Sequence, residues 1–564
     1  MTRFAFRLAL AAAALLAPAA HAQTASPYDP DPLPQAMTAA EQLRRGEIGR
    51  GFAATPPPAG ARPVGEFERS EAVLVRYPLG VPLALVAALS EHVRVITLVS
   101  GAAQRAQAAS AFAAAGVAMA RVDFLDAPTN SIWTRDYGPF FVAGADRRIG
   151  LVDFAYNRPR PDDDAVPAAL GAFLGLPVYA MPLVHTGGNY MADGRAAAAS
   201  TSLVWAENGG DAERVRRQMA DYLGVATYHV RPDPQASSIE HIDTSTKFLG
   251  ADRVLLAQVP QGHPRYAAHE AAAAYYAAQT SAYGTPYQVF RVQTPAGQPY
   301  ANALIVNERV YVPVVNAATD AAALAVYRAA MPGYDVRGIA GSWLSTDALH
   351  CRVKEVVDRG LLALRHTPPP DEIDHVPALT LGVDIVPHSG QPLVAGALHL
   401  IARVGAAPFD TLALAAVGGD TYSASVPVPA GGGEVAYYFS ASDASGRTER
   451  MPLVGPAGAR TVRVRPATVG TAPDDARAGT RIESAGPNPA RGDVSVRYTV
   501  AAPGAVRLEV LDVLGRRVAL LRDGVAAAGP HGATWAARSA PAGLYLVRLT
   551  GRDGVSVRRV TVAL

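Results

Sequence analysis

The fold of this chain is decided by the stretch AAQRAQAASAFAAAG (residues 102–116), VAMARVDFL (117–125) and SIWTRD (131–136). The first run is rich in alanine and long enough for a helix, and the second is a short apolar run typical of a buried strand. The third is a polar loop that contains Trp133 and Asp136. Alternation of helix and apolar strand predicts an α/β domain.

The same order of helix, strand and polar loop occurs five times along the chain. The later helices and strands are expected at residues 162–175 and 177–184, 211–223 and 225–231, 266–282 and 286–293, and 320–331 and 334–339. The loops that follow them contain Gly187, Gly188, Asn189, His241, Asp243, Asn302 and Cys351. A repeat of roughly fifty residues indicates repeated supersecondary units. If the units surround an axis, their loops meet at one central pocket, whereas chance alternation in an ordinary α/β protein would give no such pocket.

Turn signals and changes of composition divide the 564 residues into six segments. Arg3 and Arg7, an apolar run and Ala20-His21-Ala22 are typical of a secretory signal peptide, and the apolar run is shorter than the roughly 20 residues that span a bilayer. The expected segments are a signal peptide at 1–22, a pro-region or flexible segment at 23–65, the α/β region at 66–366, a β-sandwich at 367–465, a linker at 466–485 and a second β-sandwich at 486–564.

Charge and cysteine content narrow the classes of partner. The formal net charge is only +2 and the chain has no basic block, so the sequence gives no sign of a nucleic-acid partner. Cys351 is the single cysteine and therefore cannot form an internal disulfide. A lone cysteine is either a small buried hydrophobic residue or a reactive thiol, and its neighbours decide between the two.

The loop residues suit a nucleophilic thiol that attacks a cationic substrate. A thiol needs a positive neighbour to become a thiolate, and His241 is the candidate. Acyl transfer needs oxyanion donors, whereas a guanidinium group needs carboxylates, which Asp136 and Asp243 supply. Each residue also has a structural alternative: Asp136 would pair with Arg135, Asp243 would cap a helix, and Asn302 would stabilise a turn. The spacing shows no metal-ligand pattern, and the chemistry requires no metal or organic cofactor.

Six motifs in order resemble a known family. They are Ile132-Trp133-Thr134-Arg135-Asp136-Tyr137, Asn157-Arg158-Pro159-Arg160-Pro161, Thr186-Gly187-Gly188-Asn189-Tyr190, His241-Ile242-Asp243, Tyr300-Ala301-Asn302-Ala303-Leu304 and Ala348-Leu349-His350-Cys351-Arg352. Together they resemble the secreted bacterial peptidylarginine deiminases, relatives of the agmatine deiminases in the guanidino-modifying pentein superfamily. The resemblance covers about residues 66 to 365, and it implies a five-fold pseudosymmetric α/β propeller.

The resemblance also implies a role for each motif residue. Cys351 would attack the guanidinium carbon, and His241 would protonate the departing ammonia and then activate water. Asp136 and Asp243 would hold the guanidinium nitrogens, Asn302 would orient the reacting groups, and Trp133 would stack on the substrate. Arg158 and Arg160 would bind the main-chain carboxylate of a C-terminal arginine, unless they pair with the acidic residues at 162–164. The resemblance assigns no role to His185 or His350, and each is interpreted as a packed or hydrogen-bonded histidine.

The β segments resemble modules that follow the catalytic domain in such enzymes. Residues 367–465 resemble the immunoglobulin-like domain, and residues 486–564 resemble the C-terminal sorting domain of type IX secretion. The resemblance implies an enzyme exported through the periplasm and outer membrane, handled by the type IX machinery and then released or attached to the cell surface. The expected function is deimination of peptidyl-arginine to citrulline. An agmatine or free-arginine deiminase, a cysteine protease and a guanidinium-binding surface protein without turnover are the alternatives.

Overall fold

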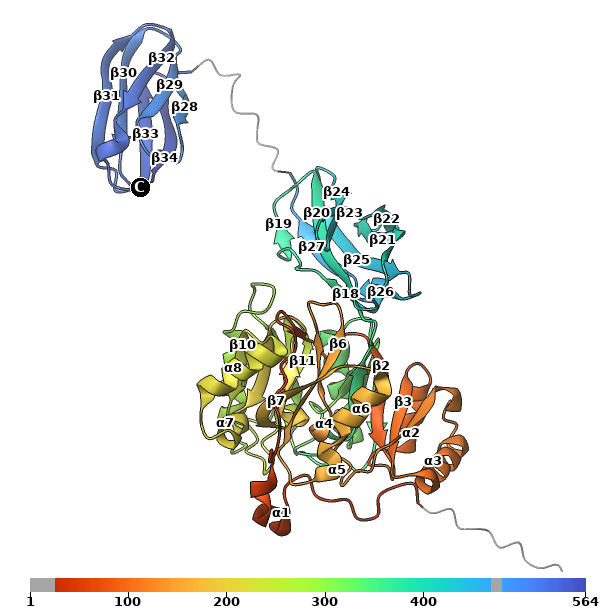
Figure 1. Ribbon diagram of the computed structural model, residues 1–564. Helices are drawn as coiled ribbons and strands as arrows, with labels where there is room; N and C mark the ends of the chain where they lie inside the picture. The colour runs from red at the N-terminus through yellow and green to blue at the C-terminus, as the bar shows by residue number, and fades with distance from the viewer. Residues whose placement is uncertain (1–25, 468–478, 564) are drawn as a thin grey trace, which may run out of the picture. The chain divides into compact units, whose positions relative to one another are not determined.

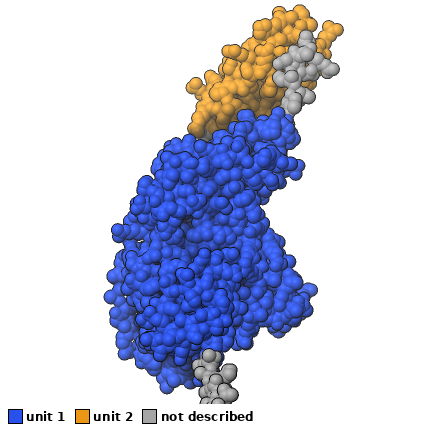
Figure 2. Space-filling model, turned by 90° about the vertical axis from the view of Figure 1, so that its right-hand side faces the viewer, with its two compact units in different colours: residues 1–467 blue, residues 468–564 orange. Residues whose placement is uncertain are grey.

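The computed structural model describes residues 26–467 and 479–563. Two compact units divide the chain, residues 1–467 and residues 468–564 (Figure 2). The expected signal peptide at 1–22 lies outside the described residues, and so does most of the expected linker at 466–485. Among the described residues, no helix is long and apolar enough to cross a membrane.

Five separate sheets form the α/β region of the first unit (Figure 1). The first sheet has the order β17(Lys354–Val357), β2(Ser70–Arg76), β3(Arg94–Val99), β4(Val122–Asp126), and the second has β1(Arg62–Pro63), β5(Phe140–Ala143), β6(Ile149–Tyr156), β7(Val178–His185). The other three are β8(Met191–Ala192), β9(Ala197–Thr201), β10(Thr227–Arg231); β11(Thr246–Gly250), β12(Arg253–Gln258), β13(Gln288–Gln293); and β14(Leu304–Val306), β15(Arg309–Val314), β16(Asp335–Ala340).

All five sheets share one pairing pattern. An antiparallel pair, such as β11 with β12, is followed by a helical crossover to a parallel neighbour, such as β13. The crossover helices are α2(Leu83–Ser90), α3(Ala102–Ala114), α5(Pro161–Asp164), α6(Val166–Leu174), α7(Leu203–Glu207), α8(Ala212–Leu223), α9(Tyr266–Ala277) and α10(Ala317–Ala330). The last strand, β17, pairs with β2, so the end of the region returns to its first sheet. The repeated unit predicted from the sequence is therefore confirmed, and the propeller arrangement stays a prediction.

Helix ends follow the local sequence. Asp211 accepts a hydrogen bond from the backbone N–H of Arg214 and caps the start of α8. The helix stops at Gly224, whose φ of 68° lies in the left-handed region that glycine adopts without strain. The strand that follows, β10, then lies parallel to β9. The predicted helix 211–223 and strand 225–231 match these elements closely.

Each predicted site loop connects one sheet to the next. The helix α4(Thr134–Tyr137) follows β4, η3(Gly187–Asn189) follows β7, and η4(Ile242–Thr244) follows β10. Asn302 lies between β13 and β14, and η5(His350–Arg352) lies between β16 and β17. Hydrogen bonds between these loops, described below, show that they meet, as the spacing predicted.

Two β-sandwiches complete the described chain. One sheet of the first sandwich consists of β18(Leu362–Arg365), β20(Ala378–Pro387), β24(Thr421–Pro427) and β23(Ala415–Gly418). The other consists of β19(Glu372–Ile373), β27(Arg460–Val464), β25(Gly433–Asp443), β21(Leu393–Val404), β22(Asp410–Ala413) and β26(Thr448–Met451). The two sheets enclose a core that includes Leu381, Ile385 and Phe439. The second consists of β28(Arg481–Gly486), β29(Val494–Val500), β32(Gly529–Trp535) and of β31(Arg517–Ala526), β30(Gly504–Leu511), β33(Gly543–Gly551), β34(Gly554–Val562). Their first strands begin a few residues before the expected boundaries at 367 and 486.

The N-terminal segment has a defined path. The sequence suggested a pro-region or a flexible segment at 23–65, but residues 26–65 include the helix α1(Ala39–Leu43) and the strand β1. Gln35 and Glu41 are buried, although an isolated segment of this composition has no core of its own. The segment is ordered because it packs against the α/β region, as the contacts below show.

Candidate active site

Cys351 lies fully buried between an amide and a carboxylate. Its Sγ is 3.2 Å from Nδ2 of Asn302 and 3.6 Å from Oδ2 of Asp243. The side-chain oxygen of Asn302 also accepts hydrogen bonds from the backbone N–H groups of His350 and Cys351. Asn302 therefore fixes both the thiol and the turn that carries it, which agrees with its predicted orienting role.

The thiol is held in its neutral form. Burial raises the pKa of Cys351 well above its ordinary value, and the negative charges of Asp243, Asp136 and Asp347 raise this pKa further. The sequence suggested that His241 would be the positive partner of Cys351. Among the described residues, however, the hydrogen bonds of Sγ go to Asn302 and Asp243 and not to His241. The role of His241 as the partner of Cys351 therefore stays a prediction.

His241 pairs instead with the carboxylate of Asp136. Nδ1 of His241 lies 3.4 Å from Oδ1 of Asp136, and both side chains are buried. Burial alone would lower the pKa of His241, but the charges of Asp136 and Asp243 outweigh it and the pKa is raised. Burial alone would raise the pKa of Asp136, but the contacts of this carboxylate with His241 outweigh burial, so the pKa of Asp136 is lowered. The pair therefore favours a protonated histidine beside an ionised aspartate.

The two glycines of the Thr186-Gly187-Gly188-Asn189 motif allow these groups to approach. A Cβ on Gly188 would lie 2.6 Å from Oδ1 of Asp136 and 2.6 Å from Nδ1 of His241. A Cβ on Gly187 would lie only 2.0 Å from the carbonyl oxygen of Arg135. Asn189 then accepts a hydrogen bond from the backbone N–H of Ile242, which ties this loop to the next. Glycine is therefore required at these two positions because the loops pack closely, and not because the glycines take part in catalysis.

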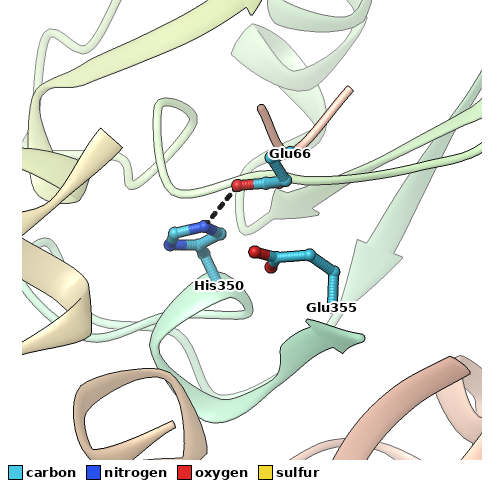
Figure 3. Close-up of side chains that lie close together, drawn as sticks. All are labelled: Glu66, His350 and Glu355. Atoms are coloured by element: carbon cyan, nitrogen blue, oxygen red, sulfur yellow. Dashed lines mark hydrogen bonds and ion pairs between the residues drawn. The ribbon is translucent and has the colours of Figure 1, made fainter. Parts of the chain in front are cut away.

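His350 connects the site to a buried charge cluster that the sequence did not reveal. Its Nδ1 lies 2.7 Å from Oδ2 of Asp243, and its Nε2 lies 2.8 Å from Oε2 of Glu66 (Figure 3). His350 is thus a hydrogen-bonded histidine, one of the two interpretations of the sequence, and it bridges the carboxylate beside Cys351 to a second carboxylate. Glu66 precedes the five repeats, and no motif marks it.

The cluster around His350 is balanced by cations. Glu66, His350 and Glu355 offer three ligand atoms within 4.8 Å of one another (Figure 3). Lys247 lies 2.7 Å from Glu66, however, and Arg135 lies 2.5 Å from Glu355, which also pairs with Lys354. Three buried cations already compensate the two carboxylates, so the donor set does not fit a divalent metal ion. Lys247 and Lys354 are the only lysines of the chain, which is a sequence signal that could have indicated this cluster.

Arg158, Arg160 and Trp133 all contact the N-terminal segment. Arg160 pairs with Glu41 at 2.6 Å and not with the acidic residues that follow it. Nε of Arg158 donates to the carbonyl oxygen of Gln35, and Nε1 of Trp133 donates to that of Leu33.

The indole ring of Trp133 has a neighbour from its own chain. The guanidinium carbon of Arg352 lies 5.6 Å from the centre of this ring, where a stacked substrate was expected. Nε of Arg352 also donates to a carboxylate oxygen of Asp347 at 2.7 Å. A cleft of about 460 Å³ lies beside these side chains, and its lining includes residues 32–36, Ser238 and Ile239.

The α/β region is similar to several known proteins. Residues 79–356 match the model of the Porphyromonas-type peptidyl-arginine deiminase family. A Vibrio parahaemolyticus protein named as a candidate agmatine deiminase is 24% identical over 281 residues, which are 42% of this chain and 78% of that protein. A similarly named protein of Yersinia pseudotuberculosis is 22% identical over 282 residues, 42% of this chain and 77% of that protein.

Two solved structures are also similar. The agmatine deiminase of Enterococcus faecalis has a TM-score of 0.49 and 20% identity, with 54% of this chain and 98% of that chain covered. A candidate arginine deiminase of Porphyromonas gingivalis has a TM-score of 0.47 and 20% identity, with 53% and 99% covered. The family match extends over the five site loops and ends within β17. Residues 79–356, which carry all five site loops, are therefore similar to the Porphyromonas-type peptidyl-arginine deiminase family and to proteins named as agmatine deiminases.

Proposed function

We propose that this protein hydrolyses the guanidinium group of peptide-borne arginine to citrulline and releases ammonia. The observation that carries the proposal is the position of the only cysteine, buried against Asp243 and Asn302. The carboxylate of Asp136 lies against His241, a histidine with a raised pKa. Two carboxylates around a thiol suit a cationic guanidinium group, whereas they would repel the oxyanion of acyl transfer.

Substrate binding supplies the positive charge that the resting thiol lacks. Burial and the charges of Asp243, Asp136 and Asp347 raise the pKa of Cys351. A guanidinium cation held by Asp136 and Asp243 opposes these charges, so the thiol loses its proton more readily when a substrate is bound. This coupling favours cationic substrates.

The thiolate of Cys351 then attacks the guanidinium carbon and forms a C–S bond. His241 gives its proton to the departing nitrogen, the C–N bond breaks and ammonia leaves. The remaining thiouronium adduct keeps the positive charge beside the two carboxylates. Neutral His241 next takes a proton from water, the remaining hydroxide oxygen bonds to the carbon, and the C–S bond breaks. The hydroxyl proton left on that oxygen passes to the Cys351 thiolate, so neutral citrulline and the resting thiol are the products. The proton that the thiol first lost leaves with ammonia as ammonium.

Arg158 and Arg160 support a preference for a peptide that ends in arginine. Arg160 holds the carboxylate of Glu41 with both Nε and Nη2, which is the two-point geometry that a guanidinium group offers to any carboxylate. A free α-carboxylate of the substrate would occupy the same donors. Agmatine has no carboxylate and would leave both arginines unused.

Turnover by the purified protein tests the proposal. Citrulline and ammonia are measured with a peptide ending in arginine, the same peptide amidated, and agmatine, with Cys351→Ala as the control. Turnover mainly of the free C-terminal arginine, lost in the variant, is the expected result. Turnover of agmatine alone would assign the activity named for the relatives, and no Cys351-dependent turnover of any of the three would overturn the proposal.

We also propose that the enzyme is exported and that residues 486–564 direct its passage across the outer membrane. Support comes from the signal-like stretch at 1–22, from the resemblance of residues 486–564 to a sorting domain, and from the compact unit that the C-terminal part of the chain forms by itself. Deletion of residues 486–564 is expected to leave the protein in the periplasm. Normal release of the shortened protein would assign the tail to adhesion or carbohydrate binding instead.

A further inference from the structure

Three successive carbonyl groups of the N-terminal segment are bound by the three side chains assigned to substrate binding. The carbonyl oxygen of Leu33 accepts from Nε1 of Trp133 at 3.0 Å, and that of Pro34 accepts from Nη2 of Arg160 at 2.7 Å. The carbonyl oxygen of Gln35 accepts from Nε of Arg158 at 2.8 Å. These donors therefore bind a peptide main chain in this structure.

The side chain of Gln35 reaches the carboxylate assigned to the guanidinium group. Its Nε2 donates to Oδ2 of Asp136 at 3.0 Å, and the residue is only 6% exposed. A primary amide presents N–H donors on a planar carbon, as a guanidinium group does, but it carries no charge. Gln35 thus occupies one of the predicted guanidinium positions without being able to react.

The carboxylate of Glu41 occupies the donors assigned to the substrate carboxylate. Its two oxygens lie 2.6 Å and 3.2 Å from Nε and Nη2 of Arg160. Thr38 and Glu41 form a capping box at the start of α1, so the short helix holds this carboxylate in place. Hydrogen bonds from Arg160 and Thr38, together with the Arg160 charge, outweigh burial and lower the pKa of Glu41 to about 2, so it is ionised at neutral pH.

We infer that residues 33–41 are a built-in pseudosubstrate that occupies the peptide-binding cleft and closes access to Cys351. The inference rests on the proposed function, because the roles of Asp136, Arg158 and Arg160 come from it. It also defines the ligand class further, because a cleft that binds three consecutive main-chain carbonyls fits an extended peptide better than a small amine. A substrate must displace the segment, and residues 42–47, which directly follow Glu41, are exposed.

Two substitutions in the full-length protein test the inference. Gln35→Ala removes the contact with Asp136, and Glu41→Gln removes the charge that Arg160 binds. The first readout is the rate at which N-ethylmaleimide labels Cys351, followed by mass spectrometry; the chain has one cysteine, so one adduct reports one site. The second readout is citrulline formation from a peptide that ends in arginine.

Labelling is expected to accelerate about tenfold in each variant, the effect of losing one hydrogen bond to a charged group, and more in the double variant. Glu47→Gln is the matched control, because Glu47 lies on the same segment but pairs with the exposed Arg44 outside the cleft. A synthetic peptide of residues 30–47 is expected to slow labelling of the double variant again, and the same peptide with Glu41→Gln is expected to slow it less.

The two readouts separate the inference from the proposed function. Faster labelling without citrulline formation would support the inference that residues 33–41 close access to Cys351, and it would contradict the proposed deiminase activity. If citrulline forms but Gln35→Ala and Glu41→Gln are labelled no faster than Glu47→Gln, the proposed deiminase activity stands and the pseudosubstrate inference is wrong. Equal melting temperatures of all variants exclude unfolding as the cause of faster labelling.

Discussion

His350 holds the carboxylate that lies beside the nucleophile. It bridges Oδ2 of Asp243 and Oε2 of Glu66 at 2.7 and 2.8 Å, so the orientation of Asp243 depends on a group that touches no substrate. A catalytic carboxylate shifted by about 1 Å loses rate because the reacting atoms are no longer aligned. His350 is therefore a positioning residue rather than a packed histidine.

Replacement of His350 by phenylalanine tests this role. His350→Phe keeps a ring of similar size but removes both hydrogen bonds, and kcat/KM is expected to fall about a hundredfold, mostly through kcat. His229→Phe is the control, because His229 is also buried, within an aromatic group on β10. Equal losses in the two variants would assign His350 a merely structural role.

The protonation of His241 depends on Asp136. The raised pKa of His241 keeps the imidazolium form to a higher pH than in a free histidine, and the form is lost as pH rises through that pKa. In Asp136→Asn, burial is opposed mainly by Asp243, so the pKa of His241 is expected to fall. Titration of the His241 ring by NMR, assigned with a His241→Gln variant, measures the change, and an unchanged pKa would contradict the pairing.

Short turns between sheets set the distances within the site. Gly188 in η3 is the tightest example, because any Cβ there would displace both Asp136 and His241. Gly188→Ala is expected to lower kcat/KM at least about a hundredfold while the fold is kept. Gly262→Ala is the control, since a Cβ there meets nothing within 4 Å and φ is not positive. Full activity of Gly188→Ala would show that the loop can move without loss of the site.

The first β-sandwich and the α/β region are joined by ion pairs within the first unit. Arg69 precedes β2 and pairs with Glu449 of β26 at 2.7 Å, and Arg447 pairs with Asp358 at 2.7 Å. The buried Glu449 makes two hydrogen bonds with Arg69. The sandwich thus stabilises the region that carries the site.

Loss of the Glu449 charge tests this coupling. Glu449→Gln is expected to lower the free energy of unfolding by about 1–3 kcal/mol, because Arg69 loses a charge-assisted partner. Calorimetry of the full chain measures the loss, and Glu434→Gln is the control on the exposed part of β25. An unchanged melting temperature would show that the two regions do not stabilise each other.

The sequence alone determined the repeated α/β unit and the loops that carry Asp136, Asn189, Asp243, Asn302 and Cys351. Both follow from local periodicity and from turn residues, which act over a few neighbouring positions. The tertiary structure alone decided which of these side chains touch. His350 and Glu66 are 284 residues apart and Arg160 and Glu41 are 119 apart, so no local pattern links them. Burial then fixed the charge states, because the pKa of each group depends on neighbours that only the fold brings together.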